Sequence, residues 1–214
     1  MKVPNLKDVF DLKVPGHYET DDYVFFWAGP FSNWEPCKFY WSVGGVASMF
    51  NCSEQAMMAA KANLFGDKES LRKIMNSDDP KVQKALGRAV SGYVESEWVA
   101  VRDDISDSFL LRKFYQNETL RNILLDTGDK IIVEASPYDK VWGIGMGVNN
   151  YPDILDQSKW KGENLLGKSL MRVRKYLRDN PFDVELEMEA VFSEEIINEI
   201  NQLTIEDILN AVKE

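Results

Sequence analysis

The chain has 214 residues, of which 44% are hydrophobic and 28% charged, and its formal net charge is −10. This length and composition suit one globular domain with a substantial core and a short appendage. No run of basic residues is present to bind nucleic acid non-specifically, and no apolar run is long enough to cross a membrane. We see no signal-peptide pattern after Met1 and expect no membrane partner.

Cysteine and histidine usage restricts the chemistry further. The two cysteines, Cys37 and Cys52, show no CxxC spacing, so we expect free thiols and a reducing, cytoplasmic compartment. His17 is the only histidine, which excludes a multi-histidine metal site and disfavours a histidine-based catalytic triad. The sequence therefore predicts chemistry without a metal or other cofactor.

The N-terminal part predicts an arm followed by strands. Residues 1–22 show little periodicity and are expected to form a covering arm. Tyr23–Trp27 is aromatic and β-branched, which predicts the first core strand. The following loop at 29–36 is rich in aromatic rings, which either pack into the core or stack on a ligand. Two apolar runs around Gly44-Gly45 predict a hairpin with a tight turn.

Helices are predicted for most of the remaining chain. Ser53 is the expected N-cap of a helix that carries Glu54 in its first turn and Lys61 on the same face. Trp98 is expected between helices. Cap residues and apolar spacing predict further helices at 67–75, from Pro80 to about Val90, at 101–116, from Asn117 to about Thr127, and at 165–178.

The C-terminal segment 181–214 is strongly acidic. Within it, 183–192 alternates acidic and apolar residues, a pattern that fits a strand and an amphipathic helix equally. Ser193 and Thr204 are the expected caps of two short helices. We interpret the segment as an extension that serves as a lid or a partner surface.

The stretch from Val133 to Gly147 is expected to lie at the centre of the function. It begins as a strand, and then Asp139 offers a carboxylate and Trp142 a large flat ring. Gly143, Gly145 and Gly147 remove side chains at every second position. Such spacing indicates either a ligand that approaches the backbone closely or a bulged core strand.

Several sequence blocks, in order, resemble one family. They are Phe31-Ser32-Asn33-Trp34 with Pro36, Ser53-Glu54-Gln55 with Ala59-Ala60-Lys61, Asp79-Pro80 with Gly87-Arg88, Lys113-Phe114-Tyr115-Gln116-Asn117, Val133-Glu134-Ala135-Ser136 with Asp139 and Trp142-Gly143-Ile144-Gly145, and Gly162 with Asn164, Leu170 and Arg174. Together they make 23–178 similar to the NADAR family, also called YbiA-like. Gln55 departs from the family pattern, which usually has histidine there, and this puts any proton transfer by that histidine in question.

The resemblance implies a fold and a domain layout. It implies an α+β fold, a mainly helical single domain with a small β-sheet. The expected layout is an arm at 1–22, a YbiA-like domain at 23–180 and an acidic extension at 181–214. The oligomeric state does not follow from the sequence.

The resemblance also implies hydrolysis of N-glycosidic bonds in phosphorylated ribosyl compounds. Its two substrate kinds are the ribosylamino-pyrimidine phosphates of riboflavin synthesis, and ADP-ribose attached to a base, notably guanine in nucleic acid. Paired carboxylates commonly stabilise the oxocarbenium-like transition state of such reactions. The implied catalytic residues are Glu54, Asp139 and Trp142. The implied substrate-binding residues are Asn33, Trp34, Lys61, Arg88, Trp98, Gly143, Gly145 and Asn164.

Three other interpretations remain open at this point. Glu54 could serve only the helix dipole, with Lys61 as its solvated partner, and Trp142 could be a core residue. The domain could be an ADP-ribose or nucleotide-binding module without turnover, as Gln55 would suggest. The acidic C-terminal segment alone would fit a structural partner of another protein.

Overall fold

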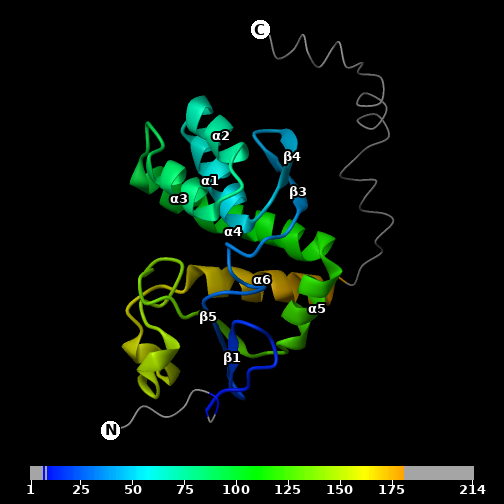
Figure 1. The fold of residues 1–214 in the computed structure, drawn as a ribbon, viewed down its shortest axis with the longest axis vertical. Helices are drawn as coiled ribbons and strands as arrows, with labels where there is room; N and C mark the ends of the chain where they lie inside the picture. Colours follow the sequence, from blue (N-terminus) through cyan, green and yellow to red (C-terminus); the bar gives the residue numbers. More distant parts are fainter. Residues whose placement is uncertain (1–6, 8, 181–214) are drawn as a thin grey trace. The chain divides into compact units, whose positions relative to one another are not determined.

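The computed structural model describes residue 7 and residues 9–180 (Figure 1). The chain divides into two compact units at Asp179 and Asn180, and the fold described here is that of the first unit. Its described residues form six α-helices and two small sheets, an α+β arrangement that confirms the expected fold class. The interpretations made for 181–214 lie outside the described residues.

A three-stranded sheet has the order β1 (His17–Glu19), β2 (Tyr23–Phe26) and β5 (Ile131–Glu134). β1 runs antiparallel to β2, whereas β2 and β5 are parallel, with Phe26 opposite Glu134. Parallel pairing brings the carboxyl ends of β2 and β5 to the same edge of the sheet. The predicted N-terminal arm contributes one strand of this sheet.

The second sheet is the predicted hairpin of β3 (Phe39–Val43) and β4 (Val46–Phe50). Gly44 and Gly45 adopt φ values of 61° and 84°. Two consecutive positive φ angles are what a tight two-residue hairpin turn requires, and glycine adopts them without steric cost. The hairpin prediction is therefore confirmed.

The helices build successive layers on the three-stranded sheet. Their bounds are α1 (Ser53–Leu64), α2 (Lys68–Met75), α3 (Pro80–Arg88), α4 (Glu95–Gln116), α5 (Glu118–Asp126) and α6 (Leu165–Asp179). Short 3-10 turns lie at η2 (Val148–Asn150), η3 (Asp153–Leu155) and η4 (Gln157–Lys159). α6 packs on β5, α4 packs on α6, α1 packs on α4, and α2 and α3 pack on α1 (Figure 1).

α6 approaches β5 closely because a glycine faces the strand. A Cβ atom at Gly167 would lie 2.1 Å from the backbone oxygen of Ile132, so no larger residue fits there without a shift. The predicted apolar stripe of α6 is buried, as expected. Its members are Leu166, Leu170, Val173 and Leu177.

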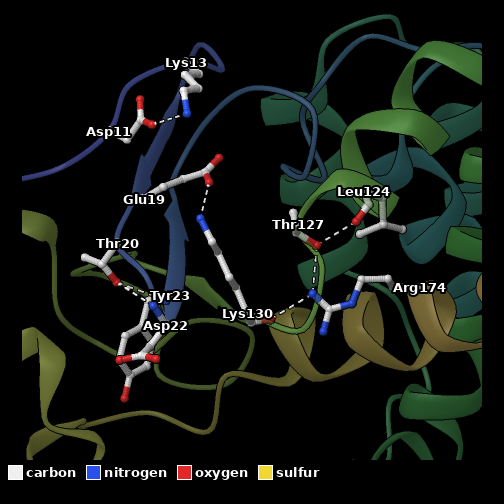
Figure 2. A network of polar contacts seen from close by, with 10 residues as sticks. All are labelled: Asp11, Lys13, Glu19, Thr20, Asp22, Tyr23, Leu124, Thr127, Lys130 and Arg174. Atoms are coloured by element: carbon white, nitrogen blue, oxygen red, sulfur yellow. Dashed lines mark hydrogen bonds and ion pairs between the residues drawn. The ribbon is translucent and has the colours of Figure 1, made fainter.

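A buried arginine ties α6 to the turn before β5 (Figure 2). Arg174 donates through Nη1 to Thr127 Oγ1 and to the backbone oxygen of Lys130, both at 2.8 Å. Lys130 in turn pairs with Glu19 of β1, Nζ to Oε2, at 2.9 Å. Arg174 therefore finds hydrogen-bond partners within the scaffold.

The structure corrects three local predictions in the helical region. The N-cap of α1 is Cys52, whose Sγ accepts from the backbone N–H of Gln55, so Ser53 is the first helical residue rather than the cap. α4 begins at Glu95 and contains Trp98, which is therefore not between helices. Asn117 precedes α5 without a side-chain cap, because its amide donates to the backbone oxygens of Lys38 and Lys113.

The segment from Val141 to Gly147 is a loop and not a strand, so the bulged-strand interpretation is wrong. Its backbone hydrogen bonds connect it to residues on both sides. The N–H of Ile144 donates to the oxygen of Glu134, and the N–H of Lys161 donates to the oxygen of Ile144. No helix among the described residues is long and apolar enough to cross a membrane.

His17 makes the stability of the fold dependent on pH. It is 1% exposed, its ring lies 4.2 Å from that of Phe31, and neither ring nitrogen has a hydrogen-bond partner among the described residues. Burial lowers the pKa of His17 to about 4. The unfolded imidazole takes up a proton below about pH 6.5, so protonation favours the unfolded chain.

We expect the free energy of unfolding contributed by His17 to fall by about 2 kcal/mol between pH 7.5 and pH 5, through proton uptake by the unfolded chain. Urea unfolding of the wild type and of His17→Phe at both pH values measures this. The free energy of unfolding of the wild type should fall relative to that of His17→Phe between pH 7.5 and pH 5. An identical pH dependence in both proteins would contradict the assignment to His17.

Candidate active site

The start of α1 places Glu54 inside the protein. Glu54 is 3% exposed, and its backbone N–H donates to the backbone oxygen of Asn33 at 2.9 Å. Its carboxylate oxygen Oε2 accepts from the indole Nε1 of Trp34 at 3.1 Å. The loop at 31–36 and the first turn of α1 therefore hold the Glu54 carboxyl group in one place.

A buried lysine of α4 fixes the loop at 31–36. Lys113 is fully buried and donates from Nζ to the backbone oxygen of Ser32 at 3.0 Å. Burial lowers the pKa of Lys113. Phe31 of the aromatic loop is in the core, as one expectation has it, whereas Trp34 is 43% exposed beside Glu54, and its stacking on a ligand stays a prediction.

A second carboxyl group, Glu134, lies at the end of β5. Its Oε2 atom is enclosed and has no hydrogen-bond partner among the described residues. Burial raises the pKa of Glu134 to about 8; the negative charge of Asp139 adds to this effect, Lys84 opposes it, and Glu54 adds a smaller contribution. A buried carboxylate without a donor is costly, so the neutral acid is the favoured form near neutral pH.

The backbone of Glu134 is held by Asn164. The Asn164 side chain accepts from the N–H of Glu134 at 3.0 Å and donates to the oxygen of Ile132 at 2.9 Å. It thus takes the place of a neighbouring strand at the open edge of β5. Asn164, implied as a substrate ligand by the resemblance, is 2% exposed with both polar atoms bonded to this backbone.

Asp139 organises the loop after β5. Its Oδ1 accepts from the backbone N–H groups of Val141 at 2.9 Å and Trp142 at 2.8 Å, which orients the carboxyl group. The oxygens of Val141 and Trp142 accept the first N–H groups of α6, those of Leu165 and Leu166. The loop therefore caps α6 while it carries Asp139 next to Glu134.

The glycines of this loop serve the same packing. A Cβ at Gly143 would lie 3.0 Å from the backbone oxygens of both Glu134 and Asp139. Gly145 has a φ of 64°, which favours glycine. The chain's own packing accounts for both residues, and a ligand contact at Gly143 or Gly145 stays a prediction.

Two cations of α3 face the carboxyl groups. Lys84 lies with Nζ 5.9 Å from the ring centroid of Trp34, and its charge stabilises the ionised forms of Glu54 and Glu134. Arg88, one helical turn further, acts on Glu54 in the same way. α3 can lie close to α1 because Gly87 has no side chain. A Cβ atom there would lie 1.9 Å from Sδ of Met58 in α1.

The pKa of Glu54 is raised overall, because burial outweighs the groups that lower it. Burial raises its pKa, while Lys84, the Trp34 indole N–H and Arg88 lower it and Asp139 raises it. Its place in the first turn of a helix had predicted a carboxylate kept ionised by the helix dipole. The structure adds burial, the largest effect on the pKa, which the sequence pattern did not indicate.

Lys61, further along α1, lies beside Tyr93 and beside the buried Trp98 of α4. Lys61 Nζ lies 4.0 Å from the ring centroid of Tyr93 and 5.7 Å from that of Trp98. Burial lowers the pKa of Lys61, Glu95 opposes this, and the nearby charge of Arg88 lowers it further. The charge of Arg88 thus acts on both Glu54 and Lys61.

The structure thus gathers Glu54, Asp139, Asn33, Trp34 and Arg88, with Lys61 and Trp98 adjoining. The indole of Trp142 makes no hydrogen bond or ring contact among the described residues, and the residue is half-buried.

Sequence reasoning missed Glu134 and Lys84. Glu134 could have been found because it ends a predicted strand immediately before the functional loop. Lys84 could have been found because it lies four residues before Arg88, on the same helical face.

Gln55 points away from the pocket. Its Oε1 accepts from the backbone N–H of Asn51 at 2.8 Å, and its Nε2 donates to the oxygens of Ile74, Met75 and Ser77 at the end of α2. Since position 55 joins α1 to α2, glutamine there removes no group from beside Glu54.

Comparison with known proteins identifies the family. The NADAR domain model matches residues 25–178. The chain belongs to the NADAR family. The protein named N-glycosidase R617 of Acanthamoeba polyphaga mimivirus is 42% identical over 165 residues, which are 73% of this chain and 96% of that protein. A riboflavin biosynthesis protein of Vibrio vulnificus is 29% identical over 76% of this chain and 38% of its own length.

The Escherichia coli protein named N-glycosidase YbiA gives a structural comparison for this NADAR chain. It is 28% identical over 178 residues, covering 83% of this chain and 96% of its own length. Its NMR structure matches 77% of this chain and 90% of its own with a TM-score of 0.59. The resemblance seen in the sequence blocks and the α+β fold are both confirmed.

The role of Asn164 can be tested by two substitutions. Asn164→Ala and Asn164→Gly both leave the N–H of Glu134 and the oxygen of Ile132 unpaired, which should cost roughly 1–3 kcal/mol of unfolding free energy. Asn164 has a φ of 56°, so alanine should cost about 1 kcal/mol more than glycine. Urea unfolding measures both. Wild-type stability in Asn164→Gly would show that the side-chain bonds do not hold β5.

Proposed function

We propose that this NADAR domain is an N-glycosidase, which hydrolyses the bond between C1 of a phosphorylated ribosyl group and a nitrogen atom of a base or amine. The observation that carries the proposal is the difference between two adjacent carboxyl groups. Glu54 accepts an indole N–H and faces Lys84 and Arg88, whereas Glu134 is enclosed without a donor on Oε2 among the described residues. Environments that differ in this way suit one base and one acid.

Glu54 acts in this mechanism in its ionised form, which Lys84, the Trp34 indole N–H and Arg88 favour against the effect of burial. As the C1–N bond breaks, positive charge develops on the ribose, and a nearby carboxylate stabilises it. The same carboxylate accepts a proton from the water that attacks C1. The Trp34 indole N–H holds Oε2 at 3.1 Å, which fixes the direction of the carboxylate.

Glu134 acts as the acid. Its raised pKa, about 8, keeps a proton on the carboxyl group at neutral pH. That proton passes to the departing nitrogen, so the base leaves as a neutral molecule and water supplies the hydroxyl group at C1. A general acid is most effective when its pKa lies near the working pH.

Asp139 keeps the proton on Glu134. Its fixed negative charge is the largest contribution after burial to the raised pKa of Glu134. Two backbone N–H groups hold its Oδ1 in place, so the charge stays next to Glu134. Asp139 is thus a positioning and electrostatic residue in this mechanism.

The remaining polar groups suit a phosphorylated ribosyl substrate. The enclosed Oδ1 of Asn33 has no donor among the described residues and can accept a ribose hydroxyl. Arg88, Lys61 and Lys84 provide positive charge for phosphate groups, and the exposed ring of Trp34 provides a surface for stacking, while Trp98 is buried beside Lys61. We propose as substrates an ADP-ribosylated base or a ribosylamino-pyrimidine phosphate.

A binding module without turnover is the second candidate function. The sequence feature that favours it is Gln55, which stands where the family usually has histidine. The Gln55 side chain is bonded to the end of α2 and lies outside the carboxyl pocket. Because Glu54 and Glu134 are both present, the hydrolase is the better-supported proposal.

The first test removes the charge of Glu54 and keeps its shape. We expect Glu54→Gln to fold and bind substrate but to lose about 10²-fold or more in turnover. Mass spectrometry of the released base, with ribosylamino-pyrimidine phosphates and ADP-ribosylated nucleosides and DNA as substrates, measures turnover. Glu69→Gln on the surface of α2 is the matched control. Turnover of Glu54→Gln close to that of the wild type would contradict the role of Glu54. A wild-type protein that binds these compounds and releases no product would favour the binding module.

The second test follows activity with pH. Glu134 loses its proton above about pH 8, in an environment set by Asp139, Lys84 and Glu54, so turnover should decline above that pH. Glu134→Gln removes the acid, so its rate should fall about 10²-fold or more. Because the amide does not titrate, the variant should also lack the decline of turnover above about pH 8. An unchanged alkaline decline in Glu134→Gln would assign the acid to another residue.

A further inference from the structure

Two exposed aromatic rings lie together outside the carboxyl pocket. Trp27 is 56% exposed and Tyr138 is 85% exposed, and their ring centroids are 6.1 Å apart at an interplanar angle of 49°. Neither the indole N–H nor the hydroxyl group makes a hydrogen bond among the described residues. The two rings are thus tilted relative to each other, and both are largely exposed.

The chain topology brings this pair to the same edge of the sheet as the carboxyl groups. Trp27 directly follows β2, and Tyr138 lies in the loop after β5, next to Asp139. Since β2 and β5 are parallel, Phe26 and Glu134 end at the same edge, and the N–H of Ala135 donates to the oxygen of Phe26 at 2.7 Å. Ligands commonly bind at the carboxyl ends of parallel strands.

Two exposed lysines accompany the rings. Lys140 lies two residues after Tyr138. Lys161 lies near Lys140, since a Cβ atom at Gly145 would be 3.1 Å from side-chain atoms of both lysines. Neither lysine makes an ion pair with a described residue. In a chain with a net charge of −10, two adjacent unpaired lysines provide local positive charge that suits a phosphate group.

We propose that Trp27 and Tyr138 form a second subsite, which stacks a nucleobase that the substrate carries in addition to its leaving group, with Lys140 and Lys161 near its phosphate. The inference rests on the proposed N-glycosidase function. Exposed aromatic rings beside lysines are the usual means of holding a base and its phosphate without sequence preference. The second base belongs to either the adenosine part of an ADP-ribosyl group or a neighbouring nucleotide of a single strand.

Binding of simple probes tests the subsite without any turnover. Indole signals of ¹⁵N-labelled protein are followed by NMR during titration with AMP, which has a base, and with ribose 5-phosphate, which has none. We expect the Trp27→Ala/Tyr138→Ala double variant to bind AMP about five- to a hundredfold more weakly, with ribose 5-phosphate binding unchanged. Trp27→Phe should retain most of the AMP affinity, and Tyr176→Ala, which changes a 48% exposed ring on α6, should retain all of it.

The result that overturns the subsite is equal AMP affinity in the wild type and the double variant, absence of AMP binding by the wild type, or equal weakening of ribose 5-phosphate. ADP-ribose and a single-stranded hexanucleotide then identify the source of the base. If one of these ligands binds more tightly than AMP, and the tighter binding requires Trp27, the second base belongs to that ligand. If neither ligand binds more tightly than AMP, the proposal is overturned. Cleavage is assayed separately, so Trp27-dependent binding without turnover would contradict the proposed function and leave the subsite standing.

Discussion

The parallel pairing of β2 with β5 is the constraint on which the candidate active site depends. It brings Phe26 and Glu134 to one edge of the sheet, and the chain then turns into the loop that carries Asp139. The free edge of β5 would expose unpaired backbone groups, and Asn164 binds them instead. The backbone at the end of β5 is thus held by hydrogen bonds on both sides, from β2 and from the Asn164 side chain.

Burial then gives the carboxyl groups different properties. Glu54 and Glu134 are both taken out of water, which raises both pKa values, but their neighbours differ. Lys84 and Asp139 act on both carboxyl groups, but Glu54 in addition has the Trp34 indole N–H and Arg88, whereas Asp139 is the largest contribution after burial at Glu134. The chemistry proposed here requires this asymmetry, because two carboxyl groups in equal environments would share a proton rather than divide the roles of acid and base.

Much of the sequence shared with the family supports the pocket rather than lining it. Lys113 holds the oxygen of Ser32, and the Gln116 side chain bonds both the N–H and the oxygen of Tyr40 in β3. Asn117 binds the oxygen of Lys38, and Arg174 joins α6 to the turn before β5. Lys113 and Arg174 are buried and Gln116 and Asn117 are half-buried, and each of these side chains links two parts of the fold.

The sequence by itself determined the elements whose cause is local. The hairpin at Gly44-Gly45, the helix at 165–178 and the strand at Tyr23 follow from turn chemistry and periodicity, which act over a few residues. The order of family blocks also pointed to Glu54, Asp139, Asn33 and Arg88. What failed locally, such as Ser53 as a cap and Trp98 between helices, concerned helix ends, where several residues satisfy the same rule.

Only the tertiary structure decided which groups meet. Glu134 and Lys84 come from different elements, and no spacing in the sequence places them beside Glu54. Burial of Glu54 and His17 is likewise a property of the layers packed around them, so the pKa of each could not be inferred from its position in the chain. The direction of Gln55, away from the pocket, was decided by the backbone oxygens at the end of α2, because a buried amide must satisfy its hydrogen bonds where partners exist.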